Sequence, residues 1–125
     1  ARPDIIKKTS KHIMAWPNGV GLTAAYHSYI DSDFIRFSRE KVLQGRAMVE
    51  KTCAQMGLTP VPSQTNFVFV DVGRDAMPVR RAMAKEGVLI NAGYDGYPQH
   101  LRVSMGRLED LKTFDRVFKR VMSGA

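Results

Sequence analysis

The chain has 125 residues, of which 44% are hydrophobic and 25% are charged, proportions that fit one compact globular domain. It lacks an apolar run of the roughly 18–20 residues that a membrane span needs, and its single cysteine, Cys53, excludes an internal disulfide. The formal net charge of +7 permits anionic partners, but the basic residues are scattered along the chain, which indicates a solvated surface rather than a nucleic-acid groove.

Helix start and stop signals predict three helices in the first half of the chain. The expected spans are residues 3–9, a helix to Ile30 capped by Asn18, and about 33–56, where Asp31 or Ser32 begins the helix and Gly57 ends it. Residues available for burial on the second helix are Val20, Leu22, Ala25, Tyr26 and Tyr29. The long third helix carries an apolar heptad stripe flanked by Ser38, Gly45 and Thr52, which suits close packing on a neighbour.

Strands and helices alternate after Gly57. The expected elements are a loop at 58–64, a strand at 66–72, a helix at 76–86 capped by Asp75, a strand at 88–90, a loop at 91–99, a strand at 100–105 and a helix at 108–122. Three helices followed by β-α-β-β-α predict an α/β fold, here a two-layer α+β sandwich in which helices cover a small, mostly antiparallel sheet.

The common catalytic and metal-binding patterns are absent from the sequence. His12, His27 and His100 are far apart, so we expect no metal site. Cys53 lies among apolar helix positions and is interpreted as a buried structural thiol. The Gly93-x-x-Gly96 spacing resembles a phosphate-clamping loop of nucleic-acid-binding domains, but here it joins two expected strands instead of two helices.

Arg102 is the strongest candidate for a functional side chain. It lies within the strand Leu101-Arg102-Val103-Ser104-Met105-Gly106, whose apolar residues fix the side of the sheet that it occupies. A guanidinium held on a strand can bind a carboxylate through two parallel hydrogen bonds. The alternative is an ordinary exposed arginine on a strand face.

Three motifs, taken in order, resemble a known family. They are Ser63-Gln64-Thr65-Asn66-Phe67-Val68, Glu86-Gly87-Val88-Leu89-Ile90 and the Arg102 strand. Together with the terminal helix they resemble the C-terminal domain of fold-type-I, class I/II aminotransferases, which depend on pyridoxal phosphate (PLP), and the histidinol-phosphate aminotransferase branch most of all. Residues 2–6 and 17–31 resemble the segments that follow the cofactor lysine in that family.

The resemblance implies roles for four residues. Arg102 would bind the carboxylate of the substrate, with Asn66 and Asn91 as weaker substrate contacts, and Asn18 would approach the active site of the partner across a homodimer. The implied substrates are an amino acid and a 2-oxo acid. We also expect a cytoplasmic location, with which the lone thiol is consistent, and neither nucleic acid nor a membrane as a partner. Residues 1–57 would form a helical interface segment and residues 58–125 the small domain.

Two departures from the family pattern limit this interpretation. Asn91 stands where histidinol-phosphate enzymes often carry an arginine for the substrate phosphate, so histidinol phosphate is in doubt as the substrate. Lys7, Lys8 and Lys11 do not match the surroundings of the Schiff-base lysine. We therefore expect no catalytic residue in this chain and no PLP bound by it alone.

The sequence begins Ala1-Arg2-Pro3-Asp4, which we interpret as part of a longer enzyme whose large domain precedes it. Two alternatives stay open. One is a PLP-dependent amino-acid decarboxylase with the same small domain, and the other is a free-standing basic α/β binding module.

Overall fold

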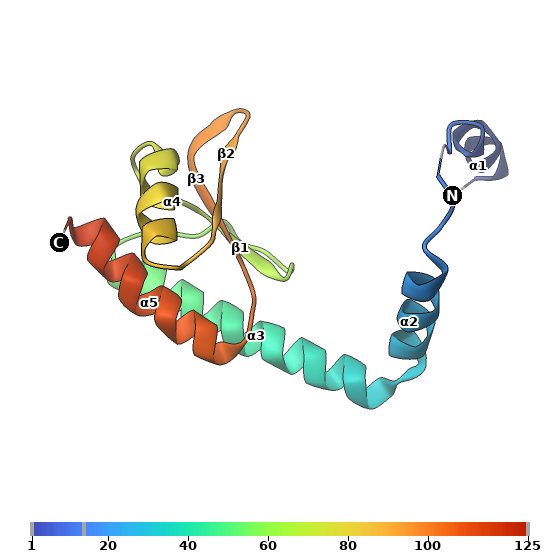
Figure 1. Ribbon diagram of the computed structural model, residues 1–125, viewed down its shortest axis with the longest axis horizontal. Coiled ribbons are helices and arrows are strands. Elements are labelled where there is room, and N and C mark those ends of the chain that lie inside the picture. Colours follow the sequence, from blue (N-terminus) through green and yellow to red (C-terminus); the bar gives the residue numbers. More distant parts are fainter. Residues whose placement is uncertain (1, 14, 125) are drawn as a thin grey trace. The chain divides into compact units, whose positions relative to one another are not determined.

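The computed structural model describes residues 2–13 and 15–124. Its helices are α1 (Pro3–Ser10), α2 (Gly19–Ile30), α3 (Ser32–Gln55), α4 (Ala76–Lys85) and α5 (Leu108–Ser123), and its strands are β1 (Phe67–Asp71), β2 (Asn91–Tyr94) and β3 (Tyr97–Ser104) (Figure 1). The chain divides into two compact units after Arg36. None of the helices in the described part is long and apolar enough to cross a membrane.

The first unit contains α1, α2 and the beginning of α3. Asn18 caps α2 as predicted, because its side-chain Oδ1 accepts a hydrogen bond of 3.0 Å from the Gly21 N–H. The apolar side chains of α2 that are available for burial are exposed here, with Val20 at 82% and Tyr29 at 85% exposure. No described residue of α2 is buried, because α2 has no partner element within this unit that covers its apolar side chains.

The second unit contains a three-stranded antiparallel sheet in the order β1-β3-β2, and this confirms the predicted fold class. In this unit α4 packs on β2 and β3, while α5 lies beside α3 and contacts α4 (Figure 1). The core lies between this layer of helices and one face of the sheet. Its buried apolar residues are Val49, Cys53, Val68, Val70, Val72, Ala76, Val79, Met83, Ile90, Leu101, Val103, Leu111, Phe114, Val117 and Phe118.

The predicted strand at 88–90 and the predicted loop at 91–99 are both wrong. Residues 88–90 lie outside the strands, and 91–94 form β2, which a two-residue turn at Asp95-Gly96 joins to β3. Gly96 has a φ of 77°, which glycine adopts without strain, and Tyr94 pairs with Tyr97 across the turn. The Gly and Pro residues that suggested a loop are accommodated by the turn and by a register shift between Ala92 and Tyr94.

Small residues bring α3 close to α5, as the stripe on α3 predicted. A Cβ atom added at Gly45 would lie only 2.8 Å from Leu111 Cδ1 and 3.3 Å from Met105 Sδ. One and two turns further along α3, Val49 and Thr52 are buried, and Thr52 Oγ1 donates a hydrogen bond of 2.6 Å to Asp115 Oδ1 on α5. These contacts fix the rotation of α3 about its own axis.

Replacing Gly45 with valine tests this close approach. Gly45→Val should lower the free energy of unfolding by about 2 kcal/mol, because the added methyl groups overpack the contact with Leu111. Ala47→Val is the matched control at an exposed position of α3 and should cost only about 0.5 kcal/mol of helix propensity. Equal losses for the two variants in chemical denaturation would contradict the close contact.

Candidate functional site

The central strand β3 holds Arg102 on the face of the sheet opposite the helices. Leu101 and Val103 on either side of it are buried in the core, so the Arg102 side chain must point to the other face, where it is half-buried. Its directly opposite neighbours are Phe69 on β1 and Asn91 on β2. Such pairs have Cβ atoms about 5 Å apart on one face. The mid-strand position predicted for Arg102 is therefore confirmed.

The ring of Phe67 lies against the Arg102 guanidinium. The Arg102 Cζ atom is 4.3 Å from the centroid of the Phe67 ring, within the range of a cation–π contact. None of the ion pairs among the described residues involves Arg102. The ring thus supports the planar cation from one side and leaves its nitrogen atoms free to donate hydrogen bonds to an incoming anion.

A hollow of about 330 Å³, called here the Arg102 hollow, opens beside this arginine. The β2–β3 ladder ends at the pair Asn91–Arg102, while β1 follows β3 as far as Ser104. Residues 87–90 therefore leave the edge of β3, and the space between them and α5 forms the hollow. Arg102, Asn91, Ser104 and Thr113 contribute polar groups to its wall.

The carboxylate on the wall of the Arg102 hollow already has a partner. Asp110 forms two hydrogen bonds of 3.0 Å with Arg107, and these hold the pKa of Asp110 below its usual value. Because Arg107 compensates this carboxylate, Arg102 is the charged residue lining the hollow that forms no ion pair among the described residues. The arrangement suits a small molecule with one carboxylate.

Of the other predicted site residues, Asn91 lines the Arg102 hollow and Asn66 lines a different one. Asn66 precedes β1, accepts a 2.9 Å hydrogen bond from the Met105 N–H through its backbone oxygen, and lines a second hollow with Arg39 and Arg46. Asn18 lies in the first unit as the cap of α2. The structure thus brings Asn91 together with Arg102 and leaves Asn66 in a different hollow.

An aromatic cluster, missed in the sequence, occupies the same sheet face near the hairpin. Phe69 stacks on His100 with 4.6 Å between ring centroids, and Tyr94 and Tyr97 meet the Phe69 ring at its edge. His100 Nδ1 is buried without a hydrogen-bond partner in the described part of the chain. The signal that could have revealed the cluster is the pair of tyrosines flanking Asp95-Gly96, a hairpin sequence.

The comparison with known proteins decides the family. The sequence pattern of the family "Aminotransferase class I and II" matches residues 4–118. The chain belongs to the class I and II aminotransferases. This membership confirms the resemblance given by the motifs.

Individual relatives point to the same branch. The chain is 38% identical over 108 residues to histidinol-phosphate aminotransferase 2 of Pseudomonas aeruginosa. The matched region covers 85% of this chain and 29% of that protein. It thus spans less than a third of the length of this curated relative.

Two solved structures share the fold. A protein of Erwinia carotovora atroseptica assigned as a histidinol-phosphate aminotransferase matches 99% of this chain and 36% of its own, with a TM-score of 0.87 and 25% identity. The histidinol-phosphate aminotransferase of Sinorhizobium meliloti, solved in complex with pyridoxal-5'-phosphate, matches 84% of this chain and 30% of its own, with a TM-score of 0.73 and 28% identity.

The described residues contain neither a metal-binding cluster nor an accessible thiol. No three His, Cys, Asp or Glu side chains gather in residues 2–13 and 15–124 as a metal ion would require. Cys53 is fully buried, and this desolvation, with a smaller contribution from Glu50, raises the pKa of its thiol to about 11. A neutral, enclosed thiol is a poor nucleophile.

Burial of Cys53 predicts slow thiol chemistry. At pH 8 the folded protein should react with an aromatic disulfide reagent at position 53 only as fast as the core opens, whereas the denatured protein should react at once. Absorbance of the released thiolate measures both rates, and the Cys53→Ser variant corrects for thiols elsewhere. Rapid reaction of the folded protein would contradict the structural role.

Proposed function

We propose that this chain is the C-terminal part of a PLP-dependent aminotransferase that moves an amino group between an amino acid and a 2-oxo acid, with Arg102 as the carboxylate anchor. The observation that carries the proposal is the guanidinium of Arg102, which is fixed on a central strand, backed by the Phe67 ring and free of ion pairs among the described residues. An amino acid and the 2-oxo acid formed from it both carry a carboxylate, so one anchor serves both halves of the reaction.

The neighbour of Arg102 bears on the substrate class. Asn91 is directly opposite Arg102 and offers an amide rather than a second cation. Histidinol phosphate, the substrate that names the relatives, carries a doubly charged phosphate and no carboxylate, which two cations would suit better than one. An amino acid recognised by its carboxylate is therefore the favoured amino donor, with histidinol phosphate as the alternative donor.

The described residues do not provide a binding site for PLP. The cofactor supplies an electron sink and needs an enclosed lysine for its Schiff base. Lysines 7, 8 and 11 are exposed, and Lys119, the half-buried one on α5, is paired with Asp115 at 2.7 Å. Residues outside this chain would hold the cofactor, which agrees with a chain that spans 29% of its relative in Pseudomonas aeruginosa.

The remaining helices support a role in assembly. We propose that residues 1–57 form a helical interface segment of a homodimer and that residues 58–125 form the small domain. The apolar side chains of α2, among them Leu22 at 59% and Tyr26 at 63% exposure, would be covered by a partner subunit or by the large domain. In that assembly Asn18 would approach the partner's active site, and Asn66 would be a weaker substrate contact.

Removing the Arg102 guanidinium tests the anchor. In the holoenzyme that carries this chain, Arg102→Gln should raise KM for the amino acid and the 2-oxo acid about 100-fold, since a bidentate charged pair is lost. Arg102→Lys should recover only part of the lost affinity, because a lysine ammonium cannot donate the two parallel hydrogen bonds of a guanidinium. PLP affinity, measured by cofactor absorbance, should stay unchanged.

The control for charge is Arg81→Gln, which removes an exposed arginine from α4 and should leave KM as it is. Loss of PLP in Arg102→Gln, with KM unchanged, would contradict the assigned role.

The Phe67 ring generates a separate prediction. Phe67→Leu should raise KM about 3- to 10-fold with a smaller change in kcat, because the guanidinium loses its cation–π support. Phe67→Tyr keeps a ring and should restore KM. If both variants lower thermal stability equally and leave KM alone, Phe67 acts only in folding.

A further inference from the structure

The hollow lined by Arg39, Arg46 and Asn66, called here the Arg39–Arg46 hollow, is a candidate site of its own. It lies between α3 and the segment that leads into β1, and its volume is about 290 Å³. It shares no lining residue with the Arg102 hollow. A role for it therefore does not depend on the function proposed for Arg102.

The spacing on α3 directs both arginines into one space. Positions 39 and 46 are two helical turns apart, about 10.5 Å along the axis, and almost on the same face. Val42 lies on this face between them, and Leu43 also lines the hollow. Two long side chains at this distance can converge on one ligand placed between them, against an apolar wall that reduces competition from water.

Arg46 is largely enclosed and yet poorly partnered. Its side chain is 12% exposed, Nη1 donates a long hydrogen bond of 3.4 Å to the Thr65 carbonyl oxygen, and Nε is 3.7 Å from Glu50 Oε1. A guanidinium has five N–H donors, so most of them have no protein acceptor here. None of its nitrogens is among the fully buried, unpartnered side-chain atoms of the described residues, so its free donors remain accessible to a ligand.

The charge of the wall is wholly positive. Arg39 and Arg46 are its charged members, and none of the Asp or Glu residues that the structure describes lines it. The hollow between α3 and α5 differs, because its lysines surround Asp115, which is paired with Lys119. Arg39 forms no ion pair among the described residues, and Arg46 has only the long 3.7 Å pair with Glu50. The two guanidinium groups together therefore match a doubly charged oxyanion, and the Asn66 amide adds a neutral donor.

We propose that the Arg39–Arg46 hollow binds a phosphate group. Arg39 and Arg46 donate to its oxygens from two sides, and Asn66 contacts a third oxygen. Because Phe67, which supports Arg102, follows Asn66 directly, an occupied hollow also steadies the beginning of β1.

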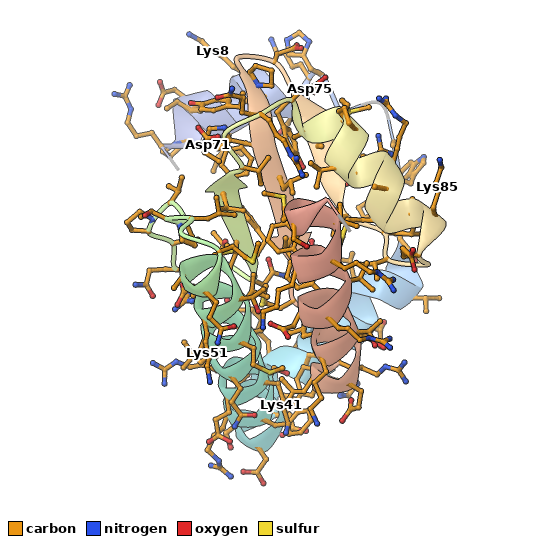
Figure 2. All side chains as sticks on the ribbon, turned by 90° about the vertical axis from the view of Figure 1, so that its left-hand side faces the viewer. Lys8, Lys41, Lys51, Asp71, Asp75 and Lys85 are labelled. Atoms are coloured by element: carbon orange, nitrogen blue, oxygen red, sulfur yellow. The ribbon has the colours of Figure 1, made fainter. Side chains whose placement is uncertain are left out.

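Calorimetric titration of the holoenzyme with inorganic phosphate at constant ionic strength tests the site. We expect saturable binding, and Arg39→Gln should weaken it at least about tenfold. Arg46→Lys should weaken it as well, because it keeps the charge and loses the paired hydrogen-bond donors of the guanidinium. Arg39 is exposed, so its replacement leaves the fold intact. The matched control is Lys51→Gln, which removes a charge from α3 (Figure 2). Lys51 does not line the Arg39–Arg46 hollow, so this variant should change the affinity less than about twofold.

Further titrations identify which hollow binds the phosphate and whether the natural ligand is a phosphate ester or the free anion. Arg102→Gln should leave phosphate binding unchanged; loss of binding in this variant would mean that phosphate occupies the Arg102 hollow, and it would overturn the proposal. Absence of binding, or equal weakening by Lys51→Gln and Arg39→Gln, would overturn it as well. Methyl phosphate that binds as well as inorganic phosphate supports a phosphate ester as ligand, and weaker binding of methyl phosphate supports the free anion.

Discussion

The alternation of side chains along β3 is the constraint on which the open face of the sheet depends. Leu101 and Val103 are buried between the sheet and the helices, so Arg102 can only face the other way. A slip of one residue in the pairing with β1 would bury the guanidinium and expose both apolar neighbours, at a large cost in free energy. The core therefore determines the direction of the side chain that we propose for substrate binding.

The packing of α3 has a similar effect on the second hollow. Gly45 and Thr52 hold one face of α3 against α5, and this fixes where the face with Arg39 and Arg46 points. In both hollows, core contacts fix the helix or strand that carries the arginine. The flat side or the stem of the arginine side chain packs against the protein. A cation held in this way loses little conformational entropy when an anion binds.

Local patterns in the sequence were sufficient to predict the order of elements and the position of Arg102. Caps at Asn18 and Asp75, and the alternation at 101–103, act within a few residues, so the sequence displays them directly. The hairpin at Asp95-Gly96 was missed because Gly and Pro residues suit loops and turns equally well.

The contacts that complete the sites depend on register between distant segments. Phe67 meets Arg102 because β1 pairs with β3 in one register, and Arg46 meets Thr65 because α3 packs beside the segment before β1. No local pattern encodes either pairing. From the sequence alone, the arginines of α3 are therefore indistinguishable from scattered surface charges. For the same reason, no local pattern places Asn66 beside Arg39 and Arg46.

The most direct test of the carboxylate anchor is a crystal structure of the holoenzyme that carries this chain with an unreactive amino-acid analogue bound. We predict that the carboxylate of the analogue lies in the plane of the Arg102 guanidinium, with two N–O distances of about 2.7–2.9 Å and the Phe67 ring still against the cation. A carboxylate bound elsewhere, with Arg102 paired to an acidic side chain of the protein, would contradict it.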